Sequence, residues 1–259
     1  MNDRNNQKAK QTSWNTVSKW YDDLLKKDPD SYQEQVITPN LNRFLNLKKD
    51  EKVLDLACGQ GYFANIFYQS GATIVASDIS RNLIEIAREH SPKDISYYVN
   101  PAHKINFVNK ESLDTVVIVL AIQNIENIAD VFAECSRVLK KGGRVVIVLN
   151  HPTFRIPQTS DWSFVDGIQS RTVAKYLSGH KIDIDMTPGE KNVKKKIKTI
   201  SFHRSLQDFV KVFHKNNFAI TRLEEWISHK KSGTGPRQNA EDIARKEIPL
   251  FMCLEIKKL

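Results

Sequence analysis

The segment of residues 53–64, VLDLACGQGYFA, constrains the fold of this chain more than any other. It is typical of an apolar strand, then a tight turn with Gly59 and Gly61, then the first turn of a helix. A second apolar run, residues 73–78, ends in Asp78. This order predicts a nucleoside-binding βαβ unit, in which glycines let the backbone approach the ligand and the acid accepts hydrogen bonds from ribose hydroxyls.

The glycine pattern alone leaves the nucleoside open, because Gly59-x-Gly61-x-x-Ala64 also fits the dinucleotide fingerprint. Asp55 lies inside the first strand, four residues before Gly59, where a dinucleotide site normally keeps an apolar residue. A carboxylate at that position is able to lie near an ammonium group. We therefore expect a ligand with a positive charge, such as the methionine end of S-adenosylmethionine. Cys58 is small and keeps the turn compact.

Three segments carry a family resemblance. Residues 55–61, DLACGQG, are similar to motif I of the class I S-adenosylmethionine-dependent methyltransferases, in the broad group called type 11. Residues 78–87, which begin with Asp78-Ile79-Ser80, resemble the second motif of that family. Residues 134–145, ECSRVLKKGGRV, resemble its signature of a helix, R-x-L-K-x-G-G and a strand. The three segments follow the order and spacing of the family across residues 50–150.

The resemblance implies S-adenosylmethionine as the cofactor, with no metal. It also implies a set of cofactor-binding residues at the turns after the strands. These are Asp55, Ala57, Cys58, Gly59, Gly61, Asp78, Ile79, Asn100, Pro101, Ala102, Leu120 and Asn124. The chain departs from the family at Asn100, where an acid usually precedes the alanine step that contacts the adenine edge. An amide is still able to accept a hydrogen bond from the adenine amino group.

Apolar runs alternate with helical patterns along the first half of the chain, which predicts a parallel sheet covered by helices. The predicted strands are 52–56, 73–78, 95–99, 115–120, 143–149, 218–227 and 249–256. The last two form an antiparallel pair in the family that the chain resembles. We therefore expect an α/β fold with a doubly wound, mostly parallel, seven-stranded Rossmann-like sheet. Ligands of such sheets bind beyond the carboxyl ends of the strands, where Asp55, Asp78, Asn100, Asn124 and Asn150 fall.

The remaining segments suggest how one domain is organised. Residues 1–12 are polar and predict a disordered tail, and residues 13–259 predict a single methyltransferase domain. Within this domain, residues 13–46 are expected to form helices that cover the cofactor, as in similar enzymes. Residues 151–202 follow the fifth strand and are expected to form a lid or substrate insertion. Ser205 and Asp208 resemble a capping box at the start of a later helix.

Methyl transfer is a direct displacement, and a base is needed only when the acceptor atom carries a proton. His151 follows the fifth strand and His203 precedes a helix, and a histidine is able to accept a proton near neutral pH. Each could instead bond to the backbone. Tyr21 completes the predicted catalytic set, because the tyrosine of the N-terminal helix is able to lie near the sulfonium in similar enzymes.

Composition narrows the functional classes. The chain has 259 residues, a formal charge of +9 and a Lys-rich run at residues 191–198. It shows neither an apolar run long enough to span a bilayer nor an apolar leader. Its three cysteines are far apart, which fits a reducing compartment and favours the cytoplasm.

The leading hypothesis is a monomeric methyltransferase that acts on oxygen or nitrogen of a small molecule. The charge of +9 and the Lys run leave RNA or protein open as the acceptor. A nicotinamide-dependent oxidoreductase and a cofactor-binding regulator without catalysis are the further alternatives.

Overall fold

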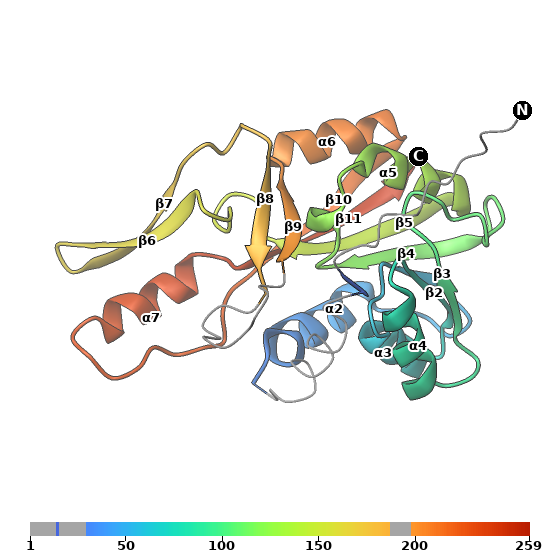
Figure 1. Cartoon of the computed structure of the whole chain (residues 1–259), viewed down its shortest axis with the longest axis horizontal. Helices are drawn as coiled ribbons and strands as arrows, with labels where there is room; N and C mark the ends of the chain where they lie inside the picture. The colour runs from blue at the N-terminus through green and yellow to red at the C-terminus, as the bar shows by residue number, and fades with distance from the viewer. Residues whose placement is uncertain (1–13, 16–29, 187–197) are drawn as a thin grey trace, which may run out of the picture.

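The computed structural model describes residues 14–15, 30–186 and 198–259 of the chain. They build a seven-stranded sheet with helices packed on both faces (Figure 1). Along the sheet the strands follow the order β10-β11-β5-β4-β1-β2-β3. These strands are β1 (Lys52–Leu56), β2 (Thr73–Asp78), β3 (Ser96–Val99), β4 (Leu113–Val119), β5 (Leu139–Asn150), β10 (Phe218–Trp226) and β11 (Phe251–Lys258).

Strand directions confirm the predicted fold class. β1 to β5 pair in parallel, whereas β11 runs antiparallel to both β5 and β10. β1 and β4 are buried along most of their length, because a central parallel strand is covered on both faces. β5 begins at Leu139, four residues before the predicted start, because Leu139 already pairs with Leu113 ahead of an irregularity in the ladder.

The helices divide between the two faces of the sheet. α2 (Thr38–Leu45), α3 (Tyr62–Gln69) and α4 (Arg81–His90) contribute to one apolar cluster, and α5 (Ile128–Val138) and α6 (Leu206–Lys215) to the other. A short π-helical turn, η1 (Gln33–Ile37), precedes α2, and a 3₁₀ turn, η2 (Ile122–Asn124), follows β4. Ser80 caps α4 by accepting from the Leu83 N–H, and Ser205 and Asp208 form the predicted capping box of α6.

Two hairpins lie between β5 and α6, within the predicted insertion of residues 151–202. β6 (Ser160–Val165) pairs with β7 (Ile168–Val173), and β8 (His180–Asp185) pairs with β9 (Lys198–His203). Figure 1 shows both hairpins on the same side of the molecule, outside the main sheet. β9 ends at His203, one residue beyond the predicted boundary. The role of this segment as a lid stays a prediction.

One helix differs from the sequence expectation. Residues 238–247 form α7 (Gln238–Glu247), where the sequence pattern indicated no element. Ala244 is the buried residue of this helix, so it shows no apolar stripe. The predicted tail, residues 1–12, and most of the first predicted helix lie outside the described residues. Among the described residues, no helix combines the length and the apolar character that crossing a bilayer demands.

Candidate active site

A cavity of about 900 Å³ lies beyond the carboxyl ends of β1, β2 and β4. All of the predicted cofactor-binding residues line it except Gly61. Trp14 also lines it, and its neighbour Asn15 is fixed to the start of α4, where the Ser80 hydroxyl donates to Asn15 Oδ1 at 2.7 Å. Residues far apart in the sequence therefore meet at the edge of the sheet where α/β proteins bind ligands.

The turn after β1 has an unusual backbone. Ala57, Gly59 and Gly61 have φ angles of 61°, 57° and 81°, in the left-handed region that favours glycine. Leu120, which follows β4, has a φ of 51° and lines the same cavity. Such a conformation costs roughly 1–2 kcal/mol in a residue with a side chain, and it concentrates at functional sites. Ala57 and Leu120 therefore mark the cavity as a place where the fold retains strain.

Gly61 faces away from the cavity. A Cβ atom at this position would overlap the Tyr97 hydroxyl and would lie 3.1 Å from the Cβ of Ala87. Tyr97 belongs to β3 and Ala87 to α4, so the glycine lets the start of α3 pack closely against both. Gly61 is thus placed to support the turn, and its direct contact with a cofactor stays a prediction.

Asp78 is held in a fixed orientation at the end of β2. Its Oδ2 accepts from the Gly59 N–H at 3.0 Å and its Oδ1 from the Ser80 N–H at 2.8 Å. Burial raises the pKa of Asp78, and the backbone N–H groups oppose that rise. The Ile79 N–H is a third backbone donor to this carboxylate. A carboxylate has about four acceptor positions, so Asp78 keeps room for a hydroxyl group in the cavity.

Asp55 contributes an unpaired carboxyl oxygen to the cavity. Its side chain is 2% exposed, it accepts from the Ala64 N–H, and its Oδ2 has no hydrogen-bond partner among the described residues. Burial and the nearby charge of Asp78 raise the pKa of Asp55 to about 8. A buried polar atom without a partner costs roughly 1–3 kcal/mol, so this oxygen fits a cationic ligand. The ammonium and sulfonium groups of S-adenosylmethionine meet that requirement.

Asn100 follows β3 and lines the cavity beside Pro101 and Ala102. Its amide nitrogen donates to the Lys104 carbonyl at 3.2 Å and to Asn106 Oδ1 at 3.0 Å. These bonds fix the side-chain amide by its nitrogen and leave its oxygen as the acceptor. This orientation agrees with the expected use of Asn100 as an acceptor at an adenine amino group, which stays a prediction.

Neither His151 nor His203 lines the cavity, although His203 directly follows Phe202, which does. His151 Nδ1 accepts from the N–H groups of Thr153 and Phe154, so Nε2 carries the proton and donates to Glu225 Oε1 at 2.7 Å. His203 Nε2 donates to the Tyr176 carbonyl at 2.7 Å. Burial lowers the pKa of both imidazoles. These contacts hold the two rings against the backbone and Glu225, and the catalytic role of either histidine stays a prediction.

The third predicted catalytic residue, Tyr21, lies outside the described residues. Among the described residues there is no cluster of three or more His, Cys, Asp or Glu side chains that could hold a metal ion.

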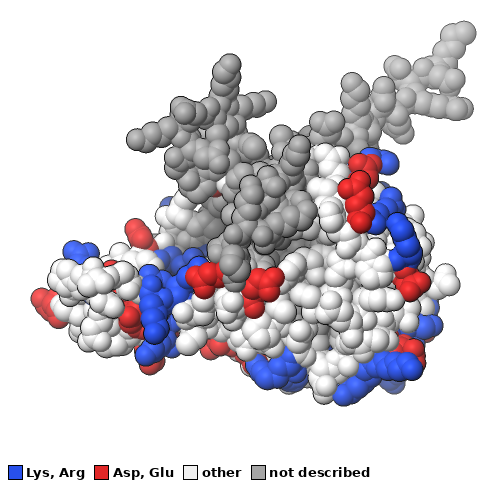
Figure 2. Space-filling model, turned by 90° about the horizontal axis from the view of Figure 1, so that it is seen from below, with Lys and Arg blue, Asp and Glu red and all other residues white. Residues whose placement is uncertain are grey.

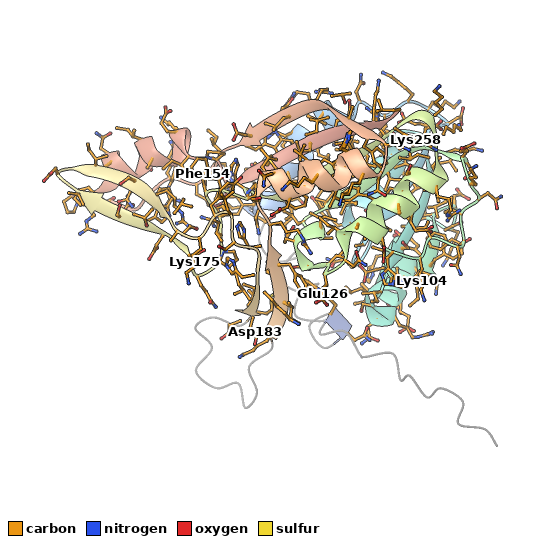
Figure 3. All side chains as sticks on the ribbon, turned by 90° about the horizontal axis from the view of Figure 1, so that it is seen from above. Lys104, Glu126, Phe154, Lys175, Asp183 and Lys258 are labelled. Carbon is orange, nitrogen blue, oxygen red and sulfur yellow. The ribbon has the colours of Figure 1, made fainter. Side chains whose placement is uncertain are left out.

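The sequence predicted a lid or substrate insertion at residues 151–202 but identified none of the residues that form the far wall of the cavity. Residues of the β8–β9 hairpin and of the loop after η2 complete the lining. Figure 3 shows Asp183 of the hairpin and Glu126 of the loop on the same side of the molecule. Each of these segments has a short polar or mixed sequence without a motif. Only the fold brings them to the strand ends.

Arg204 joins these two segments. Its Nη2 donates to the backbone carbonyls of Ile125 and Glu126 at 2.7 and 2.5 Å. The guanidinium carbon also lies 5.4 Å from the centroid of the Phe202 ring. The end of the hairpin and the loop after η2 are therefore held against each other by one side chain.

Comparisons with known proteins agree with this geometry. Residues 54–147 match the family model described as a methyltransferase domain, of the type 11 group. A demethylmenaquinone methyltransferase of Thermotoga maritima is 37% identical over 100 residues, which are 38% of this chain and 43% of that protein. The biotin biosynthesis bifunctional protein BioHC of Cellvibrio japonicus is 29% identical over 115 residues, which are 44% of this chain and 23% of that protein. The matches cover less than half the length of these relatives.

Solved structures share the fold over a longer stretch. A crystal structure of an S-adenosylmethionine-dependent methyltransferase from Mesorhizobium loti aligns with a TM-score of 0.66 at 22% identity, over 85% of this chain and 96% of that chain. A structure from Listeria monocytogenes, described as an S-adenosylmethionine-dependent methyltransferase, aligns with a TM-score of 0.63 at 20% identity, over 82% of this chain and 91% of that chain. At these identities the likeness establishes the fold.

Proposed function

We propose, from the membership of residues 54–147 in the type 11 methyltransferase family, that this chain transfers a methyl group from S-adenosylmethionine to an oxygen or nitrogen atom of a small molecule. S-adenosylmethionine is the cofactor of this family. The observation that carries the proposal is the unpaired Oδ2 of Asp55 beside Asp78 in the cavity. A dinucleotide site offers no reason for a buried carboxyl at this position.

The residues at the strand ends divide the binding between them. Asp55 binds the ammonium group, Asp78 accepts from the ribose hydroxyls, and Asn100 accepts from the adenine amino group. The turn at Ala57–Gly59 brings backbone close to the ligand. When bound, S-adenosylmethionine supplies an electrophilic methyl group for a direct displacement. The protein contributes alignment and the exclusion of water, which together reduce the barrier without a metal.

The apolar lining of the cavity supports a small molecule as the acceptor. Tyr62 and Phe63 of α3, together with Ile125, Ile200 and Phe202 of the far wall, give the cavity apolar surface. Such surface surrounds a compact ligand and matches the predominantly apolar lining of small-molecule sites. On the face seen in Figure 2, the Lys and Arg side chains of the described residues stand in separate groups interleaved with Asp and Glu. On this face the described residues therefore do not form the continuous basic surface to which a polynucleotide binds, and most of the Lys-rich run at residues 191–198 lies outside the described residues.

Glu126 is the best-placed group to receive a proton from an oxygen or nitrogen acceptor. It lines the cavity from the loop after η2, and no hydrogen bond or ion pair occupies its carboxylate among the described residues. Arg204 fixes the backbone of this residue by binding its carbonyl oxygen. A carboxylate held in this way is able to accept a proton as the methyl group arrives at the acceptor atom.

Calorimetry with S-adenosylmethionine and S-adenosylhomocysteine is the first test, with Asp78→Ala as the variant. We expect micromolar binding by the native chain and its loss in Asp78→Ala. Binding of NAD in place of both ligands would overturn the proposal in favour of an oxidoreductase.

The acceptor class requires a second measurement, in which the protein is incubated with methyl-labelled S-adenosylmethionine and a cell extract. Label in the small-molecule fraction is the expected result. Label confined to RNA or protein would show that the acceptor is a macromolecule and would overturn the small-molecule proposal. Cofactor binding without any labelled product would indicate a regulator without catalysis.

A further inference from the structure

The β8–β9 hairpin presents one face to the cavity and buries the other. Lys181 and Asp183 of β8 and Ile200 and Phe202 of β9 line the cavity. In the antiparallel register Lys181 lies opposite Phe202, and Asp183 lies opposite Ile200. Side chains alternate along each strand, so these four residues share one face of the hairpin. This face therefore combines an apolar surface with two charges of opposite sign.

The two charges differ in their surroundings. Lys198 also lines the cavity, and its Nζ lies 3.5 Å from Asp183 Oδ2, so the charges of these two residues offset each other. Lys181 has no carboxylate partner among the described residues. Its Nζ lies 5.7 Å from the centroid of the Phe202 ring. The hairpin face thus offers one uncompensated cation directly beside an aromatic ring.

The opposite wall restricts where an anion could bind. Glu126 lies on the loop after η2 and repels a negative group near its own carboxylate. The carboxylate of Asp78 does the same at the strand ends. An anionic group within this cavity is therefore directed to the hairpin, where Lys181 supplies a strong point charge with three donors.

We propose that the hairpin face is an acceptor subsite for a small molecule that carries a carboxylate or a phosphate on an aromatic or apolar body. Lys181 binds the anionic group, and Ile200 and Phe202 pack against the body. This inference rests on the proposed function, because it assigns the acceptor of the same cavity. It adds the chemical class of the acceptor, which neither the strand-end motifs nor the family match specifies.

Matched pairs of probes test the subsite by direct binding, without turnover. Phenylacetate is compared with phenylacetamide, and phenyl phosphate with phenol, by ligand-observed NMR and calorimetry on protein saturated with S-adenosylhomocysteine. We expect at least one anionic probe to bind about 10-fold or more tightly than its neutral partner, the range of a charge-assisted hydrogen bond. Equal binding, or no binding, of the members of both pairs would overturn the proposal.

Variants assign the effect to the hairpin. Lys181→Met keeps the length of the side chain and is expected to abolish the preference for the anionic probe, and Lys181→Arg is expected to retain it. Asp183→Asn releases Lys198 from its ion pair and is expected to increase the preference. Lys175→Met is the control, because Lys175 is exposed, lies outside the cavity lining and stands apart from Asp183 in Figure 3. An anion preference that survives in Lys181→Met and is unchanged in Asp183→Asn would place the anion elsewhere.

The affinity for S-adenosylhomocysteine is measured on the same samples. If the native chain binds this ligand but shows no preference for anionic probes, the subsite fails and the proposed function stands. If the native chain does not bind it at all, the proposed function itself fails.

Discussion

The carboxyl groups of Asp55 and Asp78 stand at the ends of adjacent parallel strands, and the charge of Asp78 adds to burial in raising the pKa of Asp55 to about 8. Both groups line the cavity and are less than 10% exposed. In the absence of a ligand, the pair therefore opposes a second negative charge near neutral pH. The chain keeps this unfavourable arrangement in the place where a cationic ligand would relieve it.

The first prediction concerns stability without ligand. The folded-state pKa of Asp55, about 8, lies above the ordinary value of 3.8, so between these values the folded state binds more protons than the unfolded state. The contribution of Asp55 to the free energy of unfolding therefore falls as pH rises through this window, by at most about 1.4 kcal/mol per pH unit. Asp55→Asn removes this contribution. Urea unfolding at pH 5, 6.5 and 8 should show that the variant gains stability relative to the native chain as pH rises.

The difference in the free energy of unfolding between the native chain and Asp55→Asn reports on Asp55 alone, because the two proteins share all other titrating groups. Parallel pH profiles for the native chain and Asp55→Asn would show that the carboxyl is not protonated in the folded state near pH 7.

The second prediction links cofactor binding to a proton. Because burial and Asp78 raise the pKa of Asp55 to about 8, we expect its carboxyl to be mostly protonated in the free protein at pH 7, and a cationic ligand beside it to lower that pKa again. Binding of S-adenosylhomocysteine should then release a proton, and affinity should rise with pH between about 6 and 8. Calorimetry in two buffers of different ionisation enthalpy measures this directly. Asp55→Asn should show equal heats in both buffers; equal heats in the native chain would contradict the coupling.

The third prediction tests Glu126. Glu126→Gln keeps the size and hydrogen-bonding shape of the side chain but removes its ability to accept a proton. With the small molecule that takes up label, we expect kcat to fall about 10²–10⁴-fold with little change in affinity for S-adenosylhomocysteine. Glu89→Gln on the exposed surface of α4 is the control. An unchanged kcat in Glu126→Gln across the pH range would mean that the acceptor proton leaves to water or to another group.

Sequence patterns predicted the sheet because its strands carry their own signals. Val116–Val119 is a continuous apolar run and Val53–Leu56 is apolar except for Asp55, and a strand buried on both faces requires such runs. α7 carried no such signal, since its helix is polar on nearly all sides and buries Ala244 alone. The apolar stripe that predicts a helix arises because one face of the helix is buried. A helix that buries little surface therefore has no such stripe in its sequence.

The same reasoning divides the candidate site. Asp55 and Asp78 lie at the ends of apolar strands and Gly59 lies in the turn between a strand and a helix, so the local pattern is sufficient to predict their position at the cavity. Lys181 and Phe202 are brought there by a hairpin that begins about thirty residues after β5, and no local spacing encodes that return. His151 shows the opposite case. Its position just after β5 suggested the cavity, but its ring turns toward Glu225 and the following loop.

The fourth prediction concerns the support of the turn by Gly61. Gly61→Ala places a side chain at a φ of +81° and drives its Cβ into the Tyr97 hydroxyl, so two penalties combine. Gly142→Ala is the matched control, because Gly142 has a φ of +74° but no atom within 4 Å of its Cβ position. Urea unfolding should show a loss of roughly 1–2 kcal/mol for Gly142→Ala, from the backbone alone. The loss for Gly61→Ala should be larger.

A double variant separates the two penalties at Gly61. Tyr97→Phe removes the hydroxyl that the new Cβ would overlap, although the ring carbon beneath it still lies 3.1 Å away. The loss caused by Gly61→Ala should therefore be smaller in a Tyr97→Phe background than in the native chain, and the non-additivity measures the clash. Equal losses at Gly61 and Gly142 in the native background would show that α3 and β3 separate easily at this point. In that case the glycine would serve only the backbone conformation of the turn, and close packing beneath the cofactor site would not depend on it.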